Sequence, residues 1–150
     1  MLKLSRKTLL ALEAVIDIAF NARPEPVQAK EITARQGVPQ RYLEQVMQQL
    51  VRAGILKGVR GPRGGYRLAR ERRRISVGDI VRVAESVEDA DGEETKPRSD
   101  LSARIVAPLI QSLQQDVMTR LDAVSIEDLC RQARDRGVDC GGAASADFTI

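Results

Sequence analysis

The stretch from Lys57 to Arg74, KGVRGPRGGYRLARERRR, combines arginine, glycine and proline at high density. Guanidinium groups pair with phosphates, and glycine lets a backbone approach a phosphate closely. We therefore expect this segment to contact DNA, with Arg60, Arg63 and Arg67 as candidate ligands of phosphates or of a narrow minor groove. The competing interpretation is a basic hairpin that only meets solvent.

Two short strands are expected to hold these arginines. The sequences ILKGV and GYRLA have strand composition, and RGPRG between them has the proline and glycine content of a hairpin turn. Such a hairpin directly after a helix-turn-helix is called the wing.

The residues before the hairpin, VQAKEITARQGVPQRYLEQVMQQLVRAG, predict that helix-turn-helix. A short helix around Ile32, a tight turn at Gly37 and a longer helix from residue 39 to 53 are expected. The second helix of this motif lies in the major groove of DNA, so it is called the recognition helix. By pattern alone a plain helical hairpin fits equally well, and the wing that follows favours DNA binding.

Helices are also expected on both sides of this unit. Residues 6 to 22 have the spacing of an amphipathic helix, and Ser76 with Asp79 and Ser125 with Asp128 have the spacing of capping boxes that start two further helices. The last of these helices is expected to stop at Gly137.

From residue 101 to 121 an apolar side chain recurs at every fourth position, and Pro108 marks a kink or the true helix start. A stripe this wide predicts a long helix that pairs with a second copy of the chain. Packing of this helix against the first helix is the alternative.

Charge and composition limit the function classes. Residues 1 to 84 hold 17 Lys and Arg against 7 Asp and Glu, whereas residues 85 to 150 hold 7 against 14, so a basic half precedes an acidic one. A basic half predicts a polyanionic partner. Charges interrupt the apolar run near the N-terminus, so we expect a cytoplasmic protein without membrane contact and with reduced thiols. The chain has no histidine and no catalytic constellation, so an enzyme is not expected.

These residues resemble the Rrf2 family of bacterial transcription regulators over about residues 1 to 130. The most specific segments are KLSRKTLLALEAVIDIA, RYLEQVMQQLVRAGILKGVRGPRGGYRLAR and ISVGDIVRVAE. The resemblance implies a mainly α fold with a small β-hairpin wing, that is, a winged helix-turn-helix plus a long dimerisation helix. The expected organisation is 1–84, winged helix-turn-helix DNA-binding domain; 85–100, acidic loop or linker; 101–137, dimerisation helix and following helix; 138–150, flexible C-terminal tail.

The resemblance also implies which residues meet double-stranded DNA. Arg60 matches the wing arginine of the family, which is expected at the minor groove, and Arg63 stands where the family usually has glycine. The recognition helix offers its polar positions, with Gln40, Arg41 and Gln45 as the best candidates: Gln40, Arg41, Tyr42, Glu44, Gln45 and Gln48.

Many family members hold an iron–sulfur cluster through three cysteines before the long helix. Here that loop has no cysteine, so we expect no cofactor and no metal. A thiol switch through Cys130 and Cys140 is one alternative, and it requires an exposed thiol of lowered pKa. An unidentified small ligand is another alternative.

The sequence ends in Asp147, Phe148, Thr149 and Ile150. This end resembles the C-terminal peptide with which serine acetyltransferase docks into cysteine synthase (O-acetylserine sulfhydrylase). Family members without a cluster include the cysteine-metabolism repressor that acts with that enzyme. We therefore predict a homodimeric, sequence-specific DNA-binding regulator, a repressor of cysteine metabolism that docks its tail into cysteine synthase. A protein-interaction module without DNA binding is the remaining rival.

Overall fold

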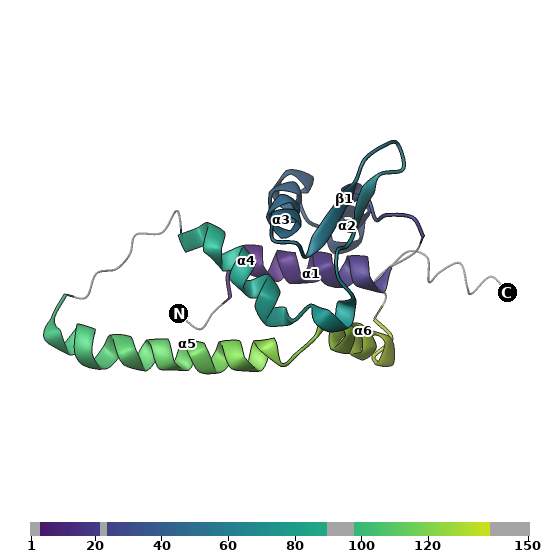
Figure 1. The fold of residues 1–150 in the computed structure, drawn as a ribbon. Coiled ribbons are helices and arrows are strands. Elements are labelled where there is room, and N and C mark those ends of the chain that lie inside the picture. The colour runs from purple at the N-terminus through teal and green to yellow at the C-terminus, as the bar shows by residue number, and fades with distance from the viewer. Residues whose placement is uncertain (1–3, 22–23, 90–97, 139–150) are drawn as a thin grey trace.

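A computed structural model describes residues 4–21, 24–89 and 98–138, which form helices and one antiparallel hairpin (Figure 1). The helical and strand elements are α1 (Arg6–Phe20), α2 (Ala29–Gln36), α3 (Gln40–Arg52), β1 (Leu56–Val59), β2 (Gly65–Leu68), the 3₁₀ turn η1 (Arg72–Arg74), α4 (Val77–Asp89), the π-helical turn η2 (Ser102–Val106), α5 (Ala107–Asp122) and α6 (Ile126–Asp135). This architecture confirms the expected mainly α fold with a β-hairpin wing.

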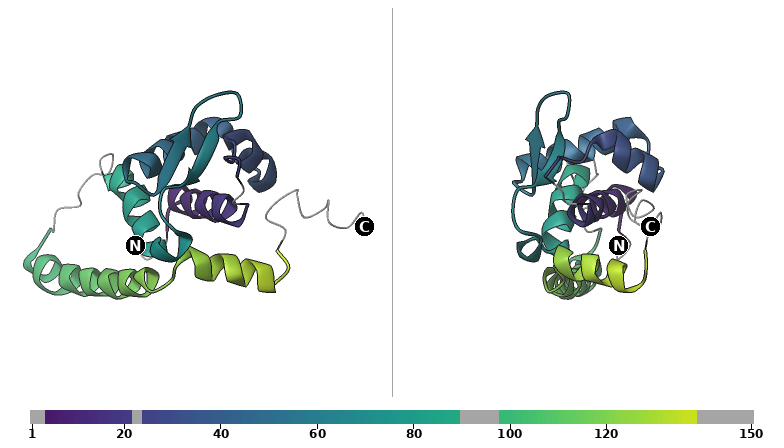
Figure 2. Two further views of the ribbon diagram at one scale, coloured as in Figure 1. Left: turned by 45° about the vertical axis from the view of Figure 1, so that its right-hand side comes forward. Right: turned by 90° about the vertical axis from the view of Figure 1, so that its right-hand side faces the viewer.

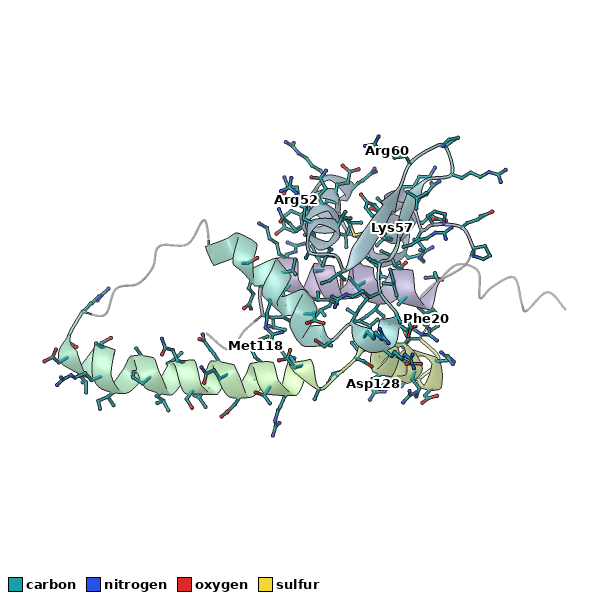
Figure 3. The ribbon with its side chains drawn as sticks, viewed as in Figure 1. Phe20, Arg52, Lys57, Arg60, Met118 and Asp128 are labelled. Carbon is teal, nitrogen blue, oxygen red and sulfur yellow. The ribbon has the colours of Figure 1, made fainter. Side chains whose placement is uncertain are left out.

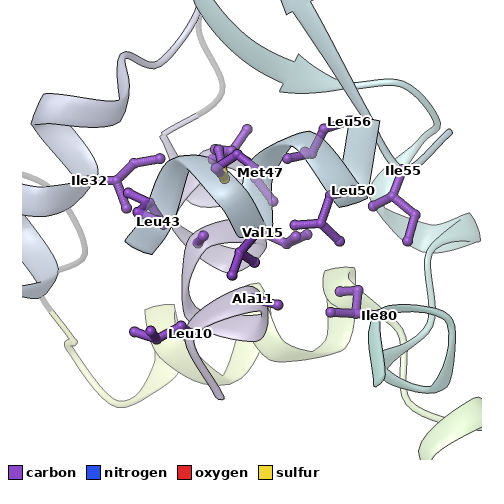
Figure 4. Packing of buried hydrophobic residues seen from close by; sticks show 14 of the residues in the cluster. Leu10, Ala11, Val15, Ile32, Leu43, Met47, Leu50, Ile55, Leu56 and Ile80 are labelled. Carbon is purple, nitrogen blue, oxygen red and sulfur yellow. The ribbon is translucent and has the colours of Figure 1, made fainter. Parts of the chain in front are cut away.

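Helix α1 lies at the centre of the molecule and contacts α2, α3, α4, α6 and β2 (Figures 1 and 2). Its buried face alternates large and small side chains, since Ala11, Ala14 and Ala19 sit among Val15 and Ile18. Short alanines let neighbouring helices approach closely, so several elements pack on a single helix. Figure 4 shows part of this apolar cluster around α1 and α3.

The helix-turn-helix forms as predicted from α2 and α3. Gly37 ends α2 with φ of 67°, a left-handed conformation that glycine adopts without steric cost, and its N–H donates to Thr33 O over 2.9 Å. Pro39 then precedes α3, where its fixed φ suits a helix start.

The wing pairs β1 with β2 in the register Leu56 to Leu68. A third segment extends it, because Val27 N–H donates to Tyr66 O over 3.0 Å and Tyr66 N–H donates to Val27 O over 2.7 Å. The chain before α2 therefore ties the wing to the helix-turn-helix. The sequence pattern gave no signal for this bridge.

Both predicted capping boxes are present, and they lie side by side. Ser76 and Ser125 pair in an antiparallel bridge, and each serine Oγ accepts the N–H of the aspartate three residues later over 3.0 Å. Helices α4 and α6 therefore start at the same place. From there α6 carries Ile126 and Cys130 into the core against α1.

Helix α4 continues to Asp89, past the expected domain boundary at residue 84. The physical reason is local, since no glycine or proline follows Gly78 until Gly92. The expected linker of residues 85 to 100 is thus partly helical, while residues 90–97 lie outside the described residues.

The long helical segment is continuous through Pro108, with a π-helical turn before it. Proline lacks an N–H and its ring crowds the carbonyl four residues earlier, and widening the preceding turn relieves that conflict. Helix α5 packs against α4 rather than against α1, which was the alternative from the sequence.

The apolar stripe of this segment faces solvent in the single chain. Leu101, Ile105 and Leu109 expose 66%, 62% and 56% of their surface.

Among the described residues, no helix combines the length and the apolar character that a membrane span requires.

Candidate nucleic-acid interface

Helix α3 divides sharply into a buried and an exposed face. Its apolar residues Leu43, Val46, Met47 and Leu50 are buried. The candidate DNA ligands among its exposed residues are Gln40, Arg41, Glu44, Gln45 and Gln48. Tyr42 differs from the other candidates because it is half-buried and packs against the core. The Tyr42 ring therefore helps to hold α3 against the core, and only the exposed part of this side chain is available to a ligand.

One hydrogen bond orients Glu44, the acidic residue of this face. Gln40 Nε2 donates to Glu44 Oε1 over 3.1 Å, which holds both side chains along the outer side of α3. Partial burial, assisted by the negative charge of Glu44, raises the pKa of the Tyr66 phenol on the wing. Glu44 therefore lies where the recognition helix meets the wing.

The arginines of the wing reach outward. Arg60 and Arg63 are exposed at its turn, and Arg67 is exposed on β2. Arg67 Nη2 donates to the carbonyl oxygen of Pro24, so this guanidinium is already engaged on one side by the protein. Among the described side chains, no carboxylate forms an ion pair with Arg60 or Arg63, which leaves their charge available to a polyanion.

The glycines of the wing serve the protein itself more than a ligand. A Cβ on Gly65 would collide with the carbonyl of Val27, and a Cβ on Gly64 would collide with the carbonyl of Val59. Gly61 has φ of 112°, which only glycine adopts readily. Requirements of turn and packing therefore account for glycine at these three positions, and contact of the wing backbone with a phosphate stays a prediction.

The recognition helix and the wing lie on one side of α1, and α5 and α6 lie on the other (Figures 1 and 2). Arg52, Lys57 and Arg60 accordingly project on the side opposite Met118 and Asp128 (Figure 3). These three cations of the basic first half therefore share the side of the molecule that carries the recognition helix and the wing. Such a surface attracts a polyanion.

A buried ionic network that the sequence pattern did not reveal fixes the angle of the helix-turn-helix. Asp17 of α1 is 1% exposed, and Arg35 of α2 donates to both of its carboxylate oxygens over 2.6 and 2.9 Å. Gln36 Nε2 donates to Asp17 Oδ2 over 2.9 Å, and Asn21 completes the group. Charge-assisted, bidentate hydrogen bonds of this kind stabilise the contact and also fix the relative orientation of the two side chains.

Cysteine and histidine, the usual ligands of an iron–sulfur cluster, are scarce in this chain. Cys130 is fully buried between α6 and α1, and no cluster of three or more His, Cys, Asp or Glu side chains suitable for a metal occurs in the described part of the chain. Cys140 and Asp147 to Ile150 lie outside the described residues. The sequence as a whole offers two cysteines and no histidine, which does not fit the usual ligand set of a cluster.

A family model for Rrf2, described as an iron-dependent transcriptional regulator, matches residues 4–132. The chain belongs to the Rrf2 family. The transcriptional regulator IscR of Vibrio atlanticus (strain LGP32) is 34% identical over 122 residues, covering 81% of this chain and 69% of that protein.

Solved structures agree with this assignment. The structure of T. potens IscR superimposes with a TM-score of 0.73 at 33% identity, covering 92% of this chain and 93% of that one. CymR (YrzC), described as the global cysteine regulator of B. subtilis, superimposes with a TM-score of 0.68 at 32% identity, covering 88% and 98%. This Rrf2 protein is therefore a winged-helix transcriptional regulator that binds DNA, and its relatives are regulators rather than enzymes.

Proposed function

We propose that this Rrf2 protein is a homodimeric repressor that binds a roughly palindromic operator. The observation that carries the proposal is the division of the fold, with the polar face of α3 and the wing arginines on one side and the exposed apolar stripe of α5 on the other. Two copies joined along α5 present two recognition helices related by a twofold axis, and such a dimer matches a palindrome.

The proposed base and phosphate contacts divide between the two DNA-facing elements. Gln40, Arg41 and Gln45 at the start of α3 are suited to base edges in the major groove or to phosphates beside it. Arg60 at the turn of the wing is suited to the minor groove, and Arg63 to a phosphate.

Selection of binding sites from random duplexes tests this proposal. We expect a motif with two inverted half-sites about one helical turn apart. Gln45→Ala should relax the preference at a particular base pair of each half-site, because a lost base contact affects only the pair it reads. Recovery of a single half-site, or of no motif, would contradict a symmetric sequence-specific dimer.

We further propose that this regulator works without an iron–sulfur cluster. The cysteine content and the absence of histidine support this, since the loop before α5 carries none of the usual ligands. A thiol switch at Cys130 is disfavoured, because a thiol buried in an apolar core is inert.

The proposed input is cysteine metabolism, sensed by docking of residues Asp147 to Ile150 into cysteine synthase. Two observations support this input: the sequence of these residues, and the similarity to a structure described as a global cysteine regulator. Affinity for purified cysteine synthase, measured with the full chain and with a chain lacking Ile150, tests it. We expect binding that disappears with Ile150 while operator binding is unchanged; equal binding by both chains, or none by either, would discard the tail.

A further inference from the structure

A hollow of about 390 Å³ opens between α1, α3 and α4. This volume lies in the range of small-molecule sites in proteins. Residues of the recognition helix form much of its wall, among them Gln45, Gln48 and Gln49. A molecule bound here would therefore touch the helix that faces DNA.

The floor of the hollow is apolar. Val83 of α4 is partly exposed there, and the buried Ala11 of α1, Leu50 of α3 and Ala84 of α4 lie beside it. Figure 4 shows Ala11 and Leu50 in the layer of side chains between α1 and α3. This floor favours a ligand with a short apolar body.

Two cations complete the lining, Lys7 from the first turn of α1 and Arg52 from the last turn of α3. Among the side chains that the structure describes, no carboxylate lies within ion-pair distance of either cation, whereas Arg35, Arg73, Arg82 and Arg131 each have one.

The position of Lys7 adds a second argument. The N-terminus of a helix carries partial positive charge, so a lysine in the first turn is unfavourable there. The first turn of α1 holds no acidic residue to offset it. An anion bound beside Lys7 would interact favourably with the ammonium group and with the helix end together.

We propose that this hollow binds a small organic anion, of the class of medium-chain carboxylates, with the carboxylate at Lys7 and Arg52 and the chain on the apolar floor. Because Gln45 and Gln48 belong both to this wall and to the DNA-facing side of α3, occupancy changes operator affinity, and DNA changes ligand affinity by the same factor. This coupling rests on the proposed role of α3 in DNA binding, whereas the binding site itself does not.

Calorimetric titration of the full chain with octanoate, without DNA, tests the site. Octylammonium, with the same chain and the opposite charge, is the ligand control. The variant Lys7→Gln with Arg52→Gln removes both cations, and Arg134→Gln with Arg136→Gln removes two exposed cations at the end of α6 as the matched control. Arg52→Lys keeps the charge and should keep most of the affinity.

The expected result is saturable binding of octanoate. The affinity should fall about tenfold or more in the Lys7 and Arg52 variant, because the loss of a charged hydrogen bond changes the affinity by about that factor. The Arg134 and Arg136 variant should bind like the parent, and octylammonium should not bind. Equal binding of both ligands, equal weakening in both variants, or no saturable binding would overturn the site. Operator binding is measured in a separate experiment, so that failure of the ligand site can be distinguished from failure of the proposed DNA-binding function.

Discussion

Arg35 of α2 donates two hydrogen bonds to the carboxylate of Asp17 of α1, from Nη2 to Oδ1 over 2.6 Å and from Nε to Oδ2 over 2.9 Å. The carboxylate is inaccessible and the guanidinium is largely covered. This pair sets how the helix-turn-helix sits on the central helix. Its loss should therefore affect both stability and DNA affinity.

Asp17→Asn should lower the free energy of unfolding by about 3 kcal/mol, because it leaves a buried guanidinium without its charged partner. Urea unfolding followed by circular dichroism measures this change. Glu13→Gln is the control on the same helix, where the side chain is exposed and the expected change is within about 0.5 kcal/mol. A similar decrease in the free energy of unfolding in both variants would contradict this account, because it would show that Asp17 contributes only its net charge and not its pairing with Arg35.

Leu109→Glu should convert the proposed dimer to monomer, since it places an unpaired charge in the apolar interface proposed along α5. Sedimentation equilibrium should show dimerisation weakened by roughly a hundredfold or more, equivalent to about 3 kcal/mol. Gln111→Glu adds the same charge on the side of α5 toward α4, and it should leave the dimer intact. A Leu109→Glu protein that remains dimeric would exclude the α5 stripe as the interface.

The cap of α6 should make stability depend on pH in the acid range. The backbone N–H of Ser125, which donates to Asp128 Oδ2 over 3.0 Å, and then the Ser125 hydroxyl lower the pKa of the Asp128 carboxyl. A carboxyl whose pKa is lowered by folding stabilises the protein above its unfolded pKa, about 3.9, and this contribution disappears as the pH falls through the folded pKa. The stability difference between the parent and Asp128→Asn should therefore be full at neutral pH and shrink below about pH 4. A difference that does not change with pH would contradict the assignment.

Iron should not govern DNA binding if the regulator lacks a cluster. Protein supplied anaerobically with ferrous iron, sulfide and reductant should retain no stoichiometric iron or acid-labile sulfide, and a chelator should leave operator affinity unchanged. Stoichiometric iron and sulfide with visible cluster absorption would contradict the proposal. Loss of that iron in Cys140→Ser would then identify one ligand.

Local sequence patterns were enough to predict most of the elements. The glycine at position 37, the serine and aspartate pairs at 76 and 79 and at 125 and 128, and the hairpin composition after α3 each act within a few residues. Such signals can be recognised in a single sequence, because the hydrogen bonds that they predict join residues only three or four positions apart. The wing and the long apolar helix were also predicted from such patterns, and the family resemblance agreed with both.

Contacts between distant segments could not be read in this way. Asp17 and Arg35 are polar residues that an amphipathic pattern assigns to solvent, and only the packing of α2 on α1 makes them a buried pair. The pairing of Val27 with Tyr66 and the hollow between α1, α3 and α4 also arise from tertiary arrangement. The exposed polar face of α3 was predictable, because the buried positions between its polar residues follow the helical period.

The salt dependence of operator binding, measured for the parent and for Arg60→Ala, tests most directly that the wing touches DNA. Each phosphate neutralised by a cation releases counterions, so losing Arg60 should weaken binding and reduce the slope of log affinity against log salt by about one unit per protomer. Arg134→Ala, at the opposite side of the fold, should leave both affinity and slope as in the parent. An Arg60→Ala protein with an unchanged slope would contradict the account.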